Sequence, residues 1–380
     1  MKATIRHSLV AALGIVALTF AVAPVAAHAT VPKAGTIKLG YFGPLTGSNA
    51  VEGIDMENAA KLAIDNWNKK GGVLGDQITL DAQDSPCVAA VAVQAAQKLV
   101  TDGVVGVVGP YCSSDAIPAS VIYHRAGIPF ITGASTNPKL TEQGFDDVFR
   151  TVGRDDEQGV FAASIMAGWH AKRIAIVHDN TTYAHGLATQ TQVALAKHPG
   201  MKVVFFDAIV PGSRDFTAIL TRIRSVKPDV TYFTGYVADG GLFVKQFVSL
   251  GVPGRIMAGD ANNGAEFISL AGKASEKAFI TGALLPQMVP SAAGFVKQFT
   301  AKYHLAPGPY SGYTYDAMNI LLYAIQKTGS TNGATLVRFL KGLKNYPGVT
   351  GPITFTSTGD RKQIQYTLLT VRHGQFVRAM

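Results

Sequence analysis

Short apolar segments alternate with amphipathic helical patterns along most of the chain, and this alternation constrains the fold more than any other feature. Segments such as 104–108 (VVGVV) lack a polar residue at every second position. Such segments are typical of parallel strands covered by helices on both faces. Because the pattern starts again after residue 151, it predicts an α/β fold with two doubly wound parallel-sheet lobes. The expected strands are 36–42, 77–83, 104–108, 128–132, 173–178, 202–209, 230–235, 255–258 and 278–284.

The helical patterns between these strands place apolar residues three and four positions apart. In the first helix, Met56, Ala60, Ala63 and Trp67 fall on one face. Ser213 is expected to cap a later helix. The other helices expected in this part of the chain are 88–101, 115–125, 157–170, 185–197 and 239–250.

The chain changes character after residue 285, where helices predominate. They contain too few strands to form a separate domain, so we expect them to return to the first lobe. The lobes are then 35–152 plus 285–352, and 153–284 plus 363–380, joined by a hinge that the chain crosses several times. The expected elements are helices at 291–303, 310–327 and 334–343, and strands at 351–355 and 363–372.

The first 29 residues have the pattern of an export signal. Lys2 and Arg6 precede an apolar run at 9–23, and Ala27-His28-Ala29 follows it. This order predicts a secretory signal cleaved near Ala29. A membrane anchor is the alternative, but the apolar run is short of the roughly 20 residues that a spanning helix needs.

The two cysteines, Cys87 and Cys112, are expected to form a disulfide in an exported protein, with two free buried thiols as the alternative. The formal net charge of +9 falls to +7 when Lys2 and Arg6 leave with the signal. The remaining basic residues are dispersed and form no stripe with aromatic residues. A nucleic-acid partner is therefore not expected.

The sequence lacks the motifs of the common catalytic sites. It contains no Gly-x-Ser-x-Gly elbow, no phosphate-binding Gly-x-x-x-x-Gly-Lys and no His-Glu-x-x-His. The nine histidines are scattered, and no metal-ligand spacing is present. We therefore expect neither an enzyme nor a protein with a metal or cofactor.

Three loops that follow predicted strands carry groups suited to a small zwitterion. Loop 109–114 leads into a helix, where free N–H groups and the Ser113 hydroxyl favour a carboxylate. Loop 133–138 has small residues and the Thr136 hydroxyl, and Asp260 is placed to neutralise an ammonium group. For Ser113 and Asp260, simple helix capping is an equal alternative.

Several short motifs carry a family resemblance in combination. They are 43–47 (GPLTG), 112–114 (CSS) with 118–120 (PAS), 174–179 (IAIVHD) with Tyr183 and 186–188 (GLA), and 204–207 (VFFD). Together they resemble the periplasmic leucine/isoleucine/valine-binding proteins, which are the substrate-binding components of ABC importers. The resemblance extends over essentially the whole mature chain and implies a type I periplasmic binding protein.

The resemblance also implies roles for individual residues. Ser113 would hold the ligand carboxylate, Ala134 and Thr136 would contact both charged ends, and Asp260 would balance the ammonium group. Cys87 and Cys112 match the disulfide pair of the family. The implied pocket aromatics are Tyr183, Tyr236 and Tyr310.

Two positions depart from the family pattern. Asp260 replaces the more usual Glu and is shorter by about 1.5 Å. Glu52 stands where leucine-binding relatives have a tyrosine that lines the side-chain pocket. A carboxylate facing an aliphatic group would cost roughly a few kcal/mol. We expect Glu52 to point to solvent, and the alternative is a ligand with a polar or cationic side chain.

The expected function is capture of a free amino acid, branched-chain or related, by hinge closure in the periplasm. The expected partners are the membrane permease subunits of an ABC importer with cytoplasmic ATPases, and the protein is expected to be a monomer. The alternatives are a binder of small aromatic or aliphatic carboxylates or amides, a ligand sensor for a signalling receptor, and an exported α/β enzyme.

Overall fold

The computed structural model describes residue 1 and residues 35–379, so the expected signal segment and its cleavage point lie outside the described residues. No helix in the described part of the chain is long and apolar enough to span a membrane.

The first sheet has five parallel strands in the order β2-β1-β3-β4-β5. The strands are β1 (Thr36–Gly43), β2 (Gln77–Asp84), β3 (Val107–Val108), β4 (Phe130–Thr132) and β5 (Val148–Arg150).

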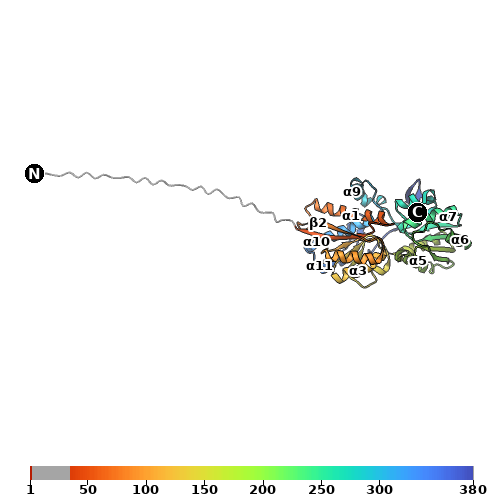
Figure 1. Cartoon of the computed structure of the whole chain (residues 1–380), viewed down its shortest axis with the longest axis horizontal. Coiled ribbons are helices and arrows are strands. Elements are labelled where there is room, and N and C mark those ends of the chain that lie inside the picture. Colours follow the sequence, from red (N-terminus) through yellow and green to blue (C-terminus); the bar gives the residue numbers. More distant parts are fainter. Residues whose placement is uncertain (2–34, 380) are drawn as a thin grey trace. The chain divides into compact units, whose positions relative to one another are not determined.

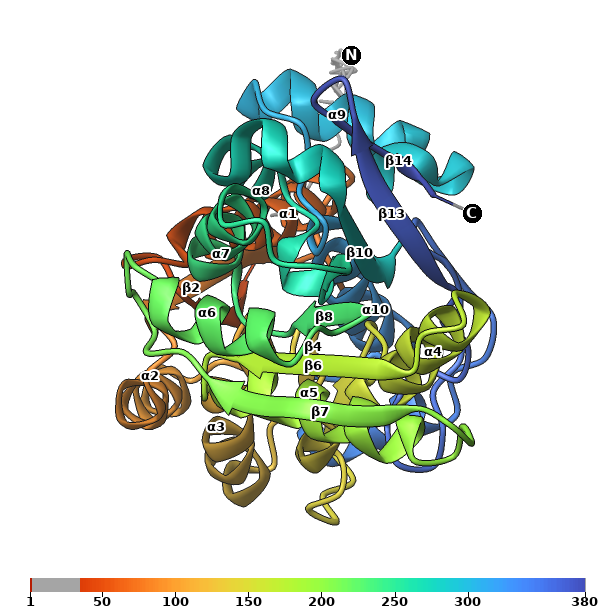
Figure 2. The same ribbon diagram turned by 90° about the vertical axis from the view of Figure 1, so that its right-hand side faces the viewer.

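The second sheet has seven strands in the order β14-β13-β10-β9-β8-β6-β7. Its strands β6 to β10 are parallel, but β13 pairs antiparallel with β10 and β14 with β13 (Figure 2). The sheet is therefore mixed, not purely parallel as expected, because the last hairpin of the chain adds to its edge. The strands are β6 (Arg173–His178), β7 (Lys202–Ala208), β8 (Val230–Phe233), β9 (Arg255–Ala258), β10 (Ala278–Ala283), β13 (Tyr366–Arg372) and β14 (Gln375–Arg378).

Helices flank both sheets, and two groups of helices lie on opposite sides of the molecule in Figure 1. One group contains α1 (Ala50–Asn68), α2 (Ala89–Thr101), α3 (Ser113–Ala126), α9 (Ala293–Tyr303), α10 (Ser311–Thr328) and α11 (Gly333–Lys341). The other contains α4 (Asp155–Gly168), α5 (Thr182–Leu195), α6 (Thr217–Ser225), α7 (Val237–Ser249) and α8 (Ala265–Ala271).

The late helices α9 and α10 pack against the early helix α1. Tyr303 OH on α9 donates to Asn58 O at 2.9 Å, and Trp67 Nε1 donates to Asn319 Oδ1 on α10 at 3.0 Å. The chain thus leaves the first sheet after β5, returns beside it after β10, and leaves again before β13. The assignment of residues to two separate lobes stays a prediction.

Local boundaries differ from the expected ones where elements are short. The strand expected at 104–108 is ordered as β3 only at Val107–Val108, and the three-residue β5 was not predicted. Ser213 does not cap α6, because that helix begins at Thr217, whose N–H donates to Asp215 Oδ1 at 2.8 Å. The hairpin of β11 (Tyr346–Gly348) and β12 (Gly351–Ile353) is also short.

The expected disulfide is present and ties the loop after β2 to the start of α3. Cys87 and Cys112 have Cα atoms 5.4 Å apart. Two hydrogen bonds reinforce the junction, from Ser85 Oγ to Asp115 Oδ2 at 2.6 Å and from Ser114 Oγ to Cys87 O at 3.2 Å. The first residue of α3, Ser113, is therefore anchored covalently through its neighbour.

We expect the double variant Cys87→Ser/Cys112→Ser to lose about 3 kcal/mol of unfolding free energy, because the bridge closes a loop and restricts the unfolded chain. Urea denaturation measures this loss. Ser114→Ala is the control, since it removes one hydrogen bond near the bridge and should cost about 1 kcal/mol. An unchanged urea midpoint in the double variant would contradict the prediction.

Candidate functional site

The predicted site residues lie on loops and helix starts that follow strands of the two sheets. Ser113 follows β3 at the start of α3, and Ala134 and Thr136 follow β4. Ligands of open parallel sheets bind beyond such carboxyl ends. On the second sheet Tyr183 follows β6, Tyr236 follows β8 and Asp260 follows β9, while Tyr310 immediately precedes α10.

The start of α3 is a buried group of hydrogen-bond donors. Ser113 is buried, and its Oγ accepts a hydrogen bond from Asn137 N at 3.4 Å, so its own hydrogen stays available. The first N–H groups of a helix have no partner within the helix, and the helix dipole favours an anion there. Thr136 Oγ1 is buried and has no hydrogen-bond partner among the described residues. This side of the site suits a carboxylate.

Hydrogen bonds and close packing against α10 hold the loop after β4. Ala134 N and Ser135 N donate to Thr132 Oγ1 at 3.2 and 3.0 Å. Gly133 lies so close to α10 that a Cβ atom there would be 2.8 Å from Thr314 N. Glycine is therefore required at this position for α10 to approach the loop.

The buried Arg150 also holds the loop after β4. Arg150 on β5 donates from Nη1 to Ser135 O at 3.0 Å and from Nη2 to Asn137 O at 3.2 Å. Its Nε donates to Asp360 Oδ1 at 2.7 Å. The loop that carries Thr136 is thus tied to the segment that leads into β13.

Asp260 lies between two tyrosine hydroxyl groups. Tyr183 OH donates to its Oδ1 at 2.6 Å, and Tyr310 OH donates to its Oδ2 at 2.9 Å. Burial raises the pKa of Asp260 above its usual value, and the two tyrosine bonds act in the opposite direction. Asp260 does not cap α8, whose N-cap is Gly264, so the capping alternative for this residue is wrong.

Asp155 is a second buried acid at the site, and sequence reasoning missed it. It is 0% exposed at the start of α4, and neither carboxylate oxygen has a hydrogen-bond partner within residues 35–379. Burial raises its pKa well above the usual value and the negative charge of Asp260 raises it further, while the nearby Thr136 hydroxyl and the charge of Arg150 act in the opposite direction. Acids are common in the first turn of a helix. The acidic run at 155–157 therefore gave no signal of a special role.

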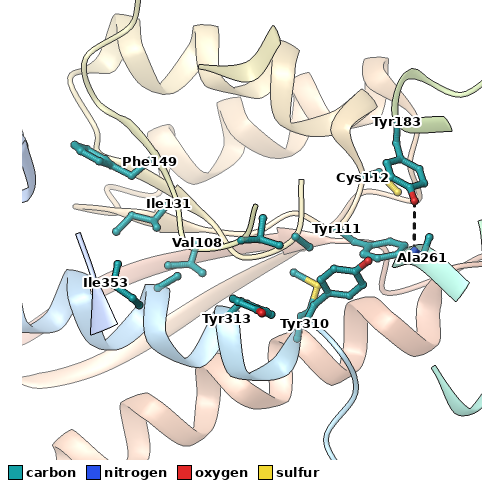
Figure 3. Close-up of a cluster of buried hydrophobic side chains, with 14 of the residues drawn as sticks. Val108, Tyr111, Cys112, Ile131, Phe149, Tyr183, Ala261, Tyr310, Tyr313 and Ile353 are labelled. Carbon is teal, nitrogen blue, oxygen red and sulfur yellow. Dashed lines mark hydrogen bonds between the residues drawn. The ribbon is translucent and has the colours of Figure 1, made fainter. Parts of the chain in front are cut away.

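Tyrosine rings pack against one another beside Asp260, and Figure 3 shows three of them, Tyr111, Tyr183 and Tyr310. The ring centroids of Tyr111 and Tyr236 are 5.3 Å apart, as are those of Tyr111 and Tyr310. Tyr183 and Tyr236 are separated by 5.0 Å. Tyr111 was not predicted as a site residue, although it lies in the predicted loop 109–114. Its hydroxyl is buried and has no hydrogen-bond partner in the described part of the chain.

Glu52 does not point to solvent, contrary to our expectation. It is 6% exposed in the first turn of α1, and its Oε2 accepts no hydrogen bond from any described residue. A Cβ atom on Gly264, just before α8, would lie 3.8 Å from Glu52 Oε1. Burial, and next the charge of Glu266, raise the pKa of Glu52 to about 8.

The cavity beside Asp260 is narrow in this conformation. The centre of a water molecule can occupy only about 10 Å³ of this cavity. The cavity therefore holds about one water. Its walls come from both sheets and from the segments between them. They are Thr136, Val152, Gly153, Asp260, Asn263, Ala283, Pro309, Tyr310, Tyr313, Ile364 and Tyr366.

A roomier hollow of about 650 Å³ lies elsewhere, between α3 and α11. There His124 Nδ1 lies 3.0 Å from Asp147 Oδ2, and Lys341 Nζ lies 3.2 Å from Asp146 Oδ2. Asp147 and Asp146 in this hollow lie next to His124 and Lys341, whereas Asp155 and Asp260, in the cleft between the two sheets, form no ion pair among residues 35–379. We therefore take the cleft as the functional site.

Comparison with known proteins shows the family to which this chain belongs. Residues 36–375 match the protein family described as periplasmic binding protein. The chain belongs to the periplasmic binding protein family. A Leu/Ile/Val-binding protein of Rhizobium johnstonii is 36% identical over 345 residues, which cover 90% of this chain and 94% of that protein.

Solved structures of periplasmic binding proteins confirm the α/β fold. The leucine-binding protein LivK from Thermotoga maritima has a TM-score of 0.84 at 28% identity, over 90% of this chain and 98% of that one. The branched-chain amino acid transporter substrate-binding protein LivJ from Streptococcus pneumoniae, in complex with isoleucine, has a TM-score of 0.82 at 27% identity, over 90% and 99% of the two chains.

In this periplasmic binding protein, Tyr183→Phe removes a hydroxyl that donates to the buried carboxylate of Asp260. We expect a loss of about 1.5–3 kcal/mol in unfolding free energy, since the bond is made to a carboxylate. Urea denaturation compares it with Tyr323→Phe, a half-buried ring that packs on Phe339. Tyr183→Phe should lose more unfolding free energy than this control. Equal losses in the two variants would contradict the prediction.

Proposed function

We propose that this periplasmic binding protein captures a free α-amino acid between two lobes and presents it to an ABC importer. The observation that carries the proposal is the pairing of two opposite environments in one buried cleft. Ser113 and Thr136 offer hydrogen-bond donors, while Asp155 and Asp260 are buried acids that form none of the ion pairs found among residues 35–379.

These two environments match the two charged ends of an amino acid. The α-carboxylate binds the start of α3 through Ser113 and the backbone and hydroxyl of Thr136. Ala134 contacts the ligand through its backbone carbonyl, because its N–H already donates to Thr132 Oγ1. The α-ammonium group binds between Asp155 and Asp260. Removing an unpaired buried carboxylate from water is costly, so a cation placed between the two acids is stabilised strongly.

Binding proceeds by hinge closure between a first lobe of residues 35–152 plus 285–352 and a second lobe of residues 153–284 plus 363–380. Contacts across the cleft support this step. Asn137 Nδ2 donates to Thr182 O at 2.9 Å, and Tyr310 OH donates to Asp260. Because the cavity admits about one water, an amino acid enters only when the two sides of the cleft move apart.

The family and the sequence together support the cellular setting. The protein is exported to the periplasm, loses residues 1–29 near Ala29, and acts as a monomer. The closed, loaded form docks on membrane permease subunits whose cytoplasmic ATPases drive import. Catalysis, a metal and a cofactor play no part in this function.

A thermal-shift screen of the mature protein against amino acids and small carboxylic acids tests the function. An amino acid at 100 times its dissociation constant should add about 2.7 kcal/mol of stability. Carboxylic acids without an amino group should add much less, because they leave Asp155 and Asp260 without a cation. Stabilisation by carboxylic acids alone would overturn the proposal in favour of a carboxylate binder.

Neutral variants of the two acids test the ammonium site. Asp155→Asn and Asp260→Asn should each weaken binding of the amino acid found in that screen at least tenfold, about 1.4 kcal/mol. Asp146→Asn is the control, since this aspartate lies away from the cleft, has a side chain that is 61% exposed and pairs with Lys341 at 3.2 Å. Calorimetry that gives the same affinity for all three variants would remove these acids from the site.

A further inference from the structure

Two more carboxylates come from helices on opposite sides of the cleft that approach each other there. A Cβ atom on Gly264, two residues before Glu266, would lie 3.8 Å from Glu52 Oε1. Glu52 lies in the first turn of α1, which packs beside the first sheet, and Glu266 lies in the first turn of α8, beside the second. Oε2 of each residue is buried and has no hydrogen-bond partner among residues 35–379. Neither residue belongs to an ion pair within that range.

A third unpaired polar group lies beside them. Tyr111 is 4% exposed, and its hydroxyl has no partner in the part of the chain that the structure describes. Burial raises the pKa of Tyr111 well above its usual value, and the nearby charge of Glu52 is the next largest cause. Its ring contacts Tyr236 and Tyr310 beside Asp260, which places Tyr111 in the same cleft.

Helix capping does not explain this arrangement. An acid in the first turn of a helix interacts favourably with the helix dipole, but that interaction needs no burial. Here Glu52 is buried and Glu266 is half-buried, so two acids lie at the cleft with little access to water. Such a pair is unfavourable unless a cation or a proton lies between them.

The charges of the cleft are also unbalanced for a ligand with an aliphatic side chain. The α-ammonium group of an amino acid is matched by Asp155 and Asp260, and the α-carboxylate by Ser113 and Thr136. Glu52 and Glu266 then remain without a positive group. A second cation on the ligand, at the end of its side chain, would supply it.

We propose that the ligand is an α-amino acid with a cationic side chain, whose terminal ammonium or guanidinium group is held by Glu52, Glu266 and the Tyr111 hydroxyl. The inference rests on the proposed function and specifies its substrate class. Because the two glutamates lie on opposite sides of the cleft, the cation also links the two sides when the cleft closes. The ligand side chain is thus part of the closing mechanism.

Calorimetry of the wild-type protein with L-lysine, L-arginine, L-norleucine, L-leucine and L-glutamine tests the inference. Norleucine has the α-groups and a linear alkyl side chain like that of lysine without its terminal amine. We expect lysine or arginine to bind at least tenfold more tightly than norleucine. Glu52→Gln and Glu266→Gln should each reduce this ratio at least tenfold.

Glu57→Gln is the matched control, because Glu57 lies on the same helix α1 and pairs with Lys61 at 2.8 Å. The Glu57→Gln variant should have the same ratio of lysine affinity to norleucine affinity as the wild-type protein. Preferred binding of lysine or arginine with an unchanged ratio in both Glu52→Gln and Glu266→Gln would overturn the assignment of the cation site to these residues.

The ligand panel separates failure of the inference from failure of the proposed function. Norleucine, leucine or glutamine binding as tightly as lysine and arginine would overturn the cationic side chain and leave the amino-acid function intact. If none of the five binds, and the thermal-shift screen finds no other amino acid, the proposed function fails and the inference fails with it.

Discussion

The buried guanidinium group of Arg150 is the interaction on which the geometry of the cleft depends. It holds the carbonyl groups of Ser135 and Asn137 and pairs with Asp360, while Arg154 Nη1 also lies 2.9 Å from Asp360 Oδ2. Arg154 immediately precedes Asp155. Asp360 therefore holds two parts of the site through these arginines: the loop that carries Thr136, and the start of the helix that carries Asp155. Losing one partner of a buried pair costs about 3–5 kcal/mol, so these two parts of the site are strongly coupled to the fold.

Two unlike sets of groups line the cleft that these interactions hold in place. One set consists of donors at the start of α3 and after β4, which the disulfide and Arg150 hold in place. The other consists of acids that are buried with little compensation. Asp260 has two tyrosine hydroxyl groups as partners, whereas Asp155, Glu52 and Glu266 leave carboxylate oxygens unpaired within residues 35–379. Protein structures seldom tolerate such groups without a role, because each costs desolvation energy. Binding of positive charge is the role that fits all of them.

Much of the fold could be predicted from sequence because its strands are apolar without alternation and its helices are amphipathic. The strand at Arg173–His178 was predicted to the residue. The loops containing Ser113 and Thr136 lie after β3 and β4 as predicted, and their binding of a ligand stays a proposal that rests on the rule that ligands bind where parallel strands end. Three-residue strands such as β5 are too short to give a pattern, and nothing in residues 366–372 indicates an antiparallel partner. The burial of Glu52 against Gly264 depends on the packing of distant segments, which a local pattern does not contain.

A crystal structure of the protein with its bound amino acid tests the central claim most directly. The claim predicts the α-carboxylate at Ser113 and Thr136 and the α-ammonium group between Asp155 and Asp260. A ligand bound in the opposite orientation, or bound in the hollow between α3 and α11, would contradict it.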